Sequence, residues 1–122
     1  MKGIVNSRGE ATLRIRLLGR GRQARTVTTV IDTGYSGAIT LPPRVVRSLR
    51  LRHLGQTDAE LGDGRIATFA VFEGAVVWNG KRVRVEISEA NTDPLLGMEL
   101  LNGFRLTIDA ERGGAVTILP LR

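Results

Sequence analysis

The fold of this chain is decided by one stretch, Val27-Thr28-Thr29-Val30-Ile31-Asp32-Thr33-Gly34-Tyr35-Ser36-Gly37. The β-branched residues 27–31 suit a buried strand, because branched side chains pack well on a pleated sheet. An ionised carboxylate directly after a core strand, as at Asp32, costs several kcal/mol unless polar groups compensate it. Gly34 and Gly37 permit a tight turn whose backbone N–H groups can face that carboxylate. The stretch therefore predicts a strand that delivers one carboxylate to a polar spot at the edge of a core.

The rest of the chain reads as further strands separated by turn signals. Residues 12–17 alternate polar and apolar, which indicates a half-buried strand, and Asn79-Gly80 is a strong signal for a two-residue hairpin turn. A short helix is expected after Pro42-Pro43, and Gly74 is expected to mark a bulge or bend. The pattern predicts a single, mostly antiparallel all-β domain over residues 1–122 with two short helices. The expected strands are 3–7, 12–17, 25–31, 38–41, 56–61, 65–78, 81–87, 95–96, 104–108 and 115–119, with the second helix at 98–101.

Composition excludes several classes of site. The chain has 42% hydrophobic residues, only 4% aromatic residues and no cysteine, so we expect an aliphatic core without disulfides or thiolate metal ligands. His53 is the only histidine, which argues against a histidine zinc site, and we expect neither a metal nor a cofactor. No apolar run approaches the ~20 residues of a membrane span, and residues 1–7 lack the apolar core of a signal peptide. We therefore expect a cytoplasmic protein with no membrane partner.

The net charge of +6 comes from 18 basic and 12 acidic residues. A positive excess can attract nucleic acid, anionic membranes or acidic substrates. Because the arginines are scattered along the sequence, we do not expect a nucleic-acid partner. Nucleic-acid binding is kept as a third hypothesis, and it predicts a steep loss of affinity with added salt.

Two segments together resemble a known family. Val30-Ile31-Asp32-Thr33-Gly34, followed about sixty residues later by Leu95-Leu96-Gly97, is similar to the paired signatures of retropepsin-like (retroviral-type) aspartic proteases. The order of hairpins, short helix and terminal strands between and after them also resembles that family over essentially the whole chain. The helix after Pro42 looks closer to cellular and bacterial members. The resemblance implies a closed β-barrel of the aspartic protease type, with one lobe and one or two short helices.

The family's chemistry depends on two carboxylates that share a proton, one acting as base on a bridging water and the other as acid toward the peptide carbonyl. This chain contains one Asp-Thr-Gly signature, so the resemblance implies a homodimer in which each subunit contributes Asp32. The implied activity is that of an aspartic endopeptidase on a peptide or protein substrate. The alternative is a dimeric peptide-binding module on the same fold with weak or absent catalysis.

The resemblance also assigns roles to individual residues. The implied catalytic residues lie in the Asp-Thr-Gly signature, where Thr33 would make hydrogen bonds across the dimer axis; they are Asp32, Thr33 and Gly34. The implied substrate-binding residues lie after this signature, in a flap tip and behind the catalytic loop; they are Tyr35, Ser36, Gly62, Asp63, Gly64 and Gly97. Residues 1–6 and 115–121 would help to form the dimer, through interleaved strands.

The chain departs from the viral pattern after each glycine. Viral enzymes usually have a small residue where this chain has Tyr35, and an acid and an arginine where it has Ser36 and Met98. Tyr35 would narrow the cleft or bind a substrate carbonyl, or it would pack at the loop edge with its hydroxyl in water. The chain also contains the residue types of a hydrolase triad, as Asp32, Ser36 and His53. We set that triad aside because Ser36 lacks the strand-to-helix elbow of such nucleophiles.

Overall fold

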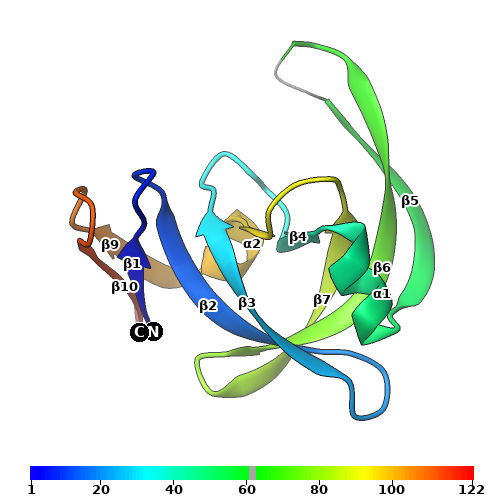
Figure 1. The fold of residues 1–122 in the computed structure, drawn as a ribbon, viewed down its shortest axis with the longest axis horizontal. Coiled ribbons are helices and arrows are strands. Elements are labelled where there is room, and N and C mark those ends of the chain that lie inside the picture. Colours follow the sequence, from blue (N-terminus) through cyan, green and yellow to red (C-terminus); the bar gives the residue numbers. More distant parts are fainter. Residues whose placement is uncertain (61–62) are drawn as a thin grey trace.

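The computed structural model describes residues 1–60 and 63–122 (Figure 1). In this part of the chain the helices are α1 (Pro43–Leu49) and α2 (Met98–Leu101), and neither is long and apolar enough to cross a membrane. The cytoplasmic location stays a prediction. The strands are β1 (Lys2–Val5), β2 (Ala11–Leu18), β3 (Ala24–Ile31), β4 (Ile39–Leu41), β5 (Arg52–Glu60), β6 (Ile66–Trp78), β7 (Lys81–Glu89), β8 (Leu95–Leu96), β9 (Phe104–Ile108) and β10 (Ala115–Pro120).

Six of these strands close into a barrel. They follow the order β6-β7-β4-β8-β3-β2, and the ring is completed where residues 16–18 of β2 pair with residues 75–77 of β6. Two pairings, β3 with β8 and β4 with β7, are parallel, and the other pairings are antiparallel. The expected closed β-barrel with two short helices is confirmed.

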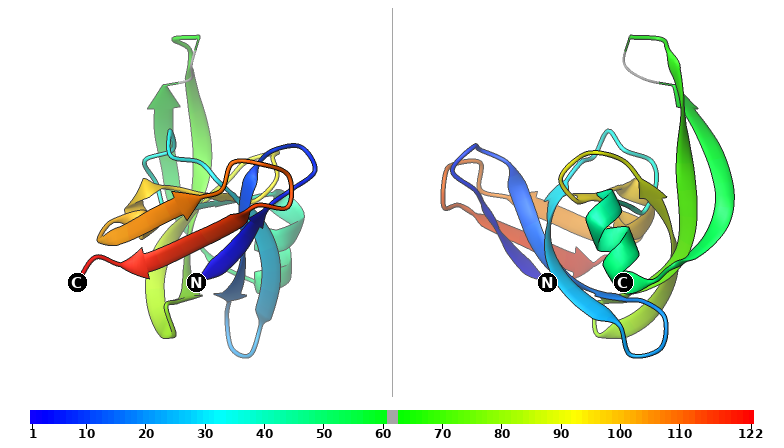
Figure 2. Two further views of the ribbon diagram at one scale, coloured as in Figure 1. Left: turned by 90° about the vertical axis from the view of Figure 1, so that its left-hand side faces the viewer. Right: turned by 45° about the vertical axis from the view of Figure 1, so that its right-hand side comes forward.

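The barrel core is aliphatic, as the composition predicts. Along β2 the apolar Leu13, Ile15 and Leu17 point inward and are buried, while Arg14 and Arg16 point outward and are exposed. The helix α1 packs its buried residues Val45, Val46 and Leu49 against the same core on one side of the barrel (Figure 2). Each fully buried aliphatic side chain of this kind contributes roughly 1.5–3 kcal/mol, so the barrel is held mainly by apolar burial.

Local turn chemistry works as expected at the β6–β7 hairpin. Trp78 pairs with Lys81, and Asn79 and Gly80 have φ angles of 51° and 79°. These values match a two-residue turn with positive φ at both positions, a geometry that suits the twist of the flanking strands. Trp78 itself is buried in the core, with its ring edge-on to Phe104, and it does not form an exposed stacking platform.

A second set of strands extends the sheet away from the barrel, on the left-hand side of Figure 1. It follows the order β2-β1-β10-β9, so β1 and β10 each have neighbours on both sides and the free edge belongs to β9. Residues 1–6 and 115–121 were expected to form interleaved strands with another copy. In this chain one edge of β10 is already paired with β9 and the other with β1, so β10 offers no free edge for such an arrangement. An assembly that extended this sheet would do so through β9.

Two local expectations, the start of the strand near residue 56 and the bulge at Gly74, are corrected by the structure. The helix α1 ends at Leu49 because Arg50 adopts a left-handed conformation (φ 53°, ψ 43°), and β5 then begins at Arg52 rather than near residue 56. His53 therefore lies on a strand, with its ring edge-on to Phe72 at 5.2 Å. Gly74 lies in a regular part of β6, and the bulge in that pairing falls between His53 and Gly55 instead. A Cβ atom at position 74 would lie 2.5 Å from Ile87 Cδ1, the end of a side chain.

Candidate active site

The strand β3 delivers Asp32 to the rim of the barrel. The Asp32 N–H donates to Leu96 O at 2.9 Å, and Val30 N–H donates to Pro94 O at 2.8 Å, so β8 holds the end of β3 on one side. The Asp32 carboxylate accepts a hydrogen bond from Gly34 N–H at 2.9 Å. Tyr35 N–H donates to Asp32 O at 3.1 Å, which closes the turn. The polar compensation expected for this carboxylate is therefore a backbone N–H of its own loop.

The loop from Asp32 to Ala38 arches over β8, which lies between β3 and β4. On the far side of the arch Gly97 N–H donates to Ala38 O at 2.9 Å, and Met98 N–H donates to Tyr35 O at 2.8 Å. A Cβ atom at position 97 would lie 2.2 Å from Gly37 O and 2.7 Å from Tyr35 O. Only glycine allows this close approach, so Gly97 packs directly against the Asp32–Ala38 loop.

The Tyr35 ring packs on two glycines. A Cβ atom at Gly37 would lie 2.5 Å from the Tyr35 hydroxyl oxygen, and one at Gly97 would lie 2.5 Å from Tyr35 Cδ2. The side chain is half-buried and also lines the pocket beside Asp32. The Tyr35 ring thus packs against the loop, and part of the side chain faces the pocket. The position has features of both the cleft and the loop-edge interpretations.

Asp32 opens onto a pocket of about 520 Å³. Its floor includes Thr40, Ser88 and Leu95, which lie side by side on β4, β7 and β8. One wall is the Asp32–Ala38 loop, and the opposite wall is the hairpin of β5 and β6, which rises beyond the barrel in Figure 1. The lining residues are Asp32, Gly34, Tyr35, Ser36, Gly37, Ala38, Thr40, Thr57, Asp58, Ala59, Phe69, Glu86, Ser88, Ala90, Thr92, Leu95 and Glu99.

The predicted site residues do not all meet at this pocket. Asp32, Gly34, Tyr35 and Ser36 line it. Thr33 is exposed and faces a separate hollow near β1 and the β9–β10 turn. Gly97 is buried behind the loop, while Gly62 lies outside the described residues. The predicted flap residues Asp63 and Gly64 are exposed in a turn, where Asp63 binds Arg65 at 2.6 Å, and they do not line the pocket.

The pocket floor and its acidic side were not predicted from the sequence. Thr40, Ser88, Glu86 and Glu99 carry no motif, and they come together through the pairing of β4 with β7 and β8 and the start of α2. The alternation of buried Val85 and Ile87 on β7 could have indicated that Glu86 and Ser88 share the opposite face. His53 is not among the pocket residues, so the three side chains of the hydrolase triad considered above do not meet in this pocket.

The clearest electrostatic feature outside the pocket is a surface triad. Glu73 binds Arg84 at 3.0 Å and Arg52 at 3.2 Å. The hydrogen bond from Arg84, with the positive charges of Arg84 and Arg52, holds the pKa of Glu73 below its ordinary value. Within residues 1–60 and 63–122, no three His, Cys, Asp or Glu side chains lie close enough to hold a metal ion.

Two solved structures show the same fold. The chain superposes on equine infectious anaemia virus (EIAV) protease, a complex with the inhibitor HBY-793, with a TM-score of 0.63 and 15% identity, covering 80% of this chain and 89% of that one. It superposes on a retropepsin-like aspartic protease from Rickettsia conorii with a TM-score of 0.58 and 18% identity, covering 100% of this chain and 91% of that one. The chain therefore has the retropepsin-like fold.

At the level of sequence, no family model matches the chain. It is 30% identical over 93 residues to an uncharacterised protein of Archaeoglobus fulgidus, covering 71% of this chain and 73% of that protein. The chain therefore belongs to the same family as this archaeal protein.

Proposed function

We propose that this protein is an aspartic endopeptidase that acts as a homodimer. The observation that carries the proposal is the position of Asp32. Its carboxylate stands at the end of a barrel strand, in a loop held by β8, and opens onto the pocket beneath the β5–β6 hairpin. Its place on a retropepsin-like fold supports a role in peptide hydrolysis.

The proposed reaction needs a second carboxylate beside the first. Two adjacent carboxylates share one proton because both cannot ionise easily at short distance. The ionised one takes a proton from a water molecule as the water oxygen attacks the peptide carbonyl carbon, and the protonated one donates to the carbonyl oxygen. Collapse of the tetrahedral intermediate then breaks the C–N bond, and the nitrogen leaves with a proton.

The second carboxylate is proposed to be Asp32 of another copy. The sequence contains a single Asp-Thr-Gly signature, and Thr33 beside it is exposed. A two-fold axis through this loop would bring the two Asp32 side chains together and let the two Thr33 side chains meet across it. Gly34 would then allow the peptide backbone to approach the carboxylates.

Peptide hydrolysis by wild type and Asp32→Asn, measured from acidic to neutral pH, tests the proposal. The amide has nearly the same shape but cannot act as base, so we expect a loss of at least about 100-fold in kcat/KM. Asp109→Asn is the matched control, because Asp109 is exposed and lies outside the pocket, and it should keep wild-type activity. Equal activity in wild type and Asp32→Asn would remove Asp32 from the mechanism.

Pairing of the two carboxylates has its own test. Light scattering should give about twice the 13.3 kDa mass of one chain. After equal amounts of wild type and Asp32→Asn have exchanged subunits, about one quarter of random dimers carry two Asp32 residues. Activity should therefore fall to about a quarter of that of the same total amount of wild type. A fall to one half would show that each chain works alone.

A further inference from the structure

The pocket beside Asp32 is acidic although the chain as a whole is basic. Four of the residues that line it are acids, namely Asp32, Asp58, Glu86 and Glu99. The lining, as far as the structure describes the chain, contains no lysine and no arginine. The complete chain carries 18 basic and 12 acidic residues, so composition alone would predict the opposite. The fold has therefore concentrated negative charge at this pocket.

Within the described residues, these carboxylates are not neutralised by ion pairs. In the part of the chain that the structure describes, none of the four forms a salt bridge, and the polar partners of Asp58 and Asp32 are the Thr68 hydroxyl and Gly34 N–H. A second hollow of about 540 Å³ adjoins at Glu86 and Glu99, and its arginines, Arg52 and Arg84, both bind Glu73. The pocket acids remain free to meet a cationic group.

A hydroxyl on the pocket floor is also available to a ligand. Thr40 has only 6% of its surface exposed, yet its hydroxyl oxygen is not among the fully buried atoms and makes no hydrogen bond with the described residues. The hydroxyl is therefore open to the pocket, where it can bond to water or to a polar group that enters. The acids do not suit a metal ion, since no three lie close enough together within residues 1–60 and 63–122. Separated carboxylates with a polar floor suit an extended chain that carries basic side chains.

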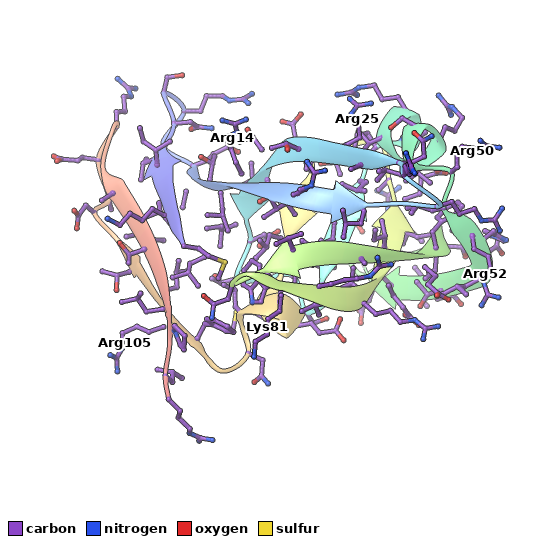
Figure 3. The ribbon with its side chains drawn as sticks, turned by 90° about the horizontal axis from the view of Figure 1, so that it is seen from below. Arg14, Arg25, Arg50, Arg52, Lys81 and Arg105 are labelled. Atoms are coloured by element: carbon purple, nitrogen blue, oxygen red, sulfur yellow. The ribbon has the colours of Figure 1, made fainter. Side chains whose placement is uncertain are left out.

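The turns on the upper side of Figure 1 carry more acidic than basic residues. The hairpin end and the β1–β2, β7–β8 and β9–β10 turns hold Glu10, Asp63, Asp93, Asp109 and Glu111 against Arg8, Arg65 and Arg112. The residues labelled in the view from below, the side away from the hairpin tip, are basic: Arg14, Arg25, Arg50, Arg52, Lys81 and Arg105 (Figure 3). Of these, Arg52 borders the second hollow beside Glu86 and Glu99, where it binds Glu73. An excess of acidic residues on the upper side favours the approach of a cationic partner from there.

We infer that the substrate is a peptide segment with a lysine or arginine close to the bond that is cut, and that Glu86 and Glu99 recognise this basic side chain. The inference rests on the proposed peptidase function and adds the class of substrate. Asp32 would remain the catalytic group. Glu86 on β7 and Glu99 on α2 would act by charge at the end of the pocket where it meets the second hollow.

The test begins with cleavage of a proteome-derived peptide library, read by mass spectrometry. We expect lysine and arginine to be enriched within the few positions on either side of the cut bonds. The best cleaved peptide and its counterpart with glutamine at the basic position are then compared for wild type and the Glu86→Gln/Glu99→Gln double variant. Because both glutamates are exposed, each should contribute roughly a two- to fivefold preference, so kcat/KM for the basic peptide should fall roughly 4- to 25-fold.

Two comparisons separate a charge effect from damage to the fold. The double variant should lose much less activity on the glutamine peptide than on the basic peptide, and an unfolding midpoint in urea equal to that of wild type would show that it is folded. Glu89→Gln removes the same charge from the same strand outside the pocket, and it should leave both rates unchanged. No enrichment of basic residues at cut sites, or an equal loss for both peptides in the double variant, would overturn the inference.

Absence of all cleavage would contradict the endopeptidase proposal, and binding would then decide the inference separately. Fluorescence anisotropy would compare labelled extended peptides that differ only by arginine or glutamine. Tighter binding of the arginine peptide, lost in the double variant, would support recognition of basic side chains. Equal binding of the two peptides would overturn it.

Discussion

Replacing Gly97 with alanine probes the contact that supports the Asp32 loop. The backbone at position 97 (φ −112°, ψ −178°) is accessible to alanine, so the effect is steric rather than conformational. The new methyl carbon would lie 2.2 Å from Gly37 O, whereas ordinary contact begins near 3.4 Å. The loop and β8 would have to separate by about 1.2 Å, the difference between these distances.

A separation of this size breaks the hydrogen bonds that join the loop to this segment. They run from Gly97 N–H to Ala38 O, from Met98 N–H to Tyr35 O and from Glu99 N–H to Gly37 O, at 2.9, 2.8 and 3.2 Å. At about 0.5–1.5 kcal/mol each, with added strain in the packed barrel, the expected loss of stability is about 2–4 kcal/mol. Activity should fall with it, because the same loop presents Asp32.

Urea unfolding followed by circular dichroism, at one fixed protein concentration, measures this loss. Gly74→Ala is the matched control: its Cβ would lie 2.5 Å from Ile87 Cδ1, the end of a side chain that can rotate away, so the cost should be about 1 kcal/mol. Tyr35→Ala should not rescue Gly97→Ala, because the shortest contact is with a backbone oxygen. Gly97→Ala within 1 kcal/mol of wild type, or no more costly than Gly74→Ala, would refute the argument.

Three further predictions follow from single contacts. Thr29→Val should lower the free energy of unfolding by about 1–2 kcal/mol in urea titrations, because the fully buried Thr29 hydroxyl donates to Leu13 O at 2.8 Å; no loss would contradict this. The depressed pKa of Glu73 means that its ion pairs stabilise the fold above its ordinary pKa of 4.5 and are lost as pH falls through the depressed value. In NMR titrations Arg84→Gln should raise that midpoint, and an unchanged midpoint would argue against Arg84 as the main cause. Arg50→Gly should raise the thermal midpoint, by about 0.5–1 kcal/mol of stability, because glycine adopts the left-handed conformation at the end of α1 without a steric penalty; a lower midpoint would be the contrary result.

Local patterns predicted the parts of the fold that depend on local chemistry. Alternation located β2 and β7, the Asn79-Gly80 pair located its turn, and Leu95-Leu96 was expected as a short strand. The start of β5 was missed because Arg52 and His53 show no strand periodicity. They are held extended by pairing with Glu73 and Phe72 of β6, a contact that is not visible in neighbouring residues.

The candidate site was predictable only where a motif marks it. Asp32, Gly34 and Gly97 were expected from their signatures, and the structure explains Gly97 by a close backbone approach. The pocket floor could not be found in this way, since Thr40 and Ser88 meet only because β4 pairs with β7. Charge behaved similarly: the four acids that line the pocket come from β5, β7, α2 and the loop after β3, and they share a pocket without lysine or arginine among its described residues only once the barrel closes.

The insertion of β8 between β3 and β4 has a consequence for the order of folding. The carboxylate and its loop are synthesised early, but their support at residues 95–97 arrives about sixty residues later. Contacts of such long sequence separation form late, because a large loop must close before they contribute. A nascent chain that ends before Pro94 would hold Asp32 without the contacts that order its loop, so this loop cannot take its final position before residues 95–97 have been made.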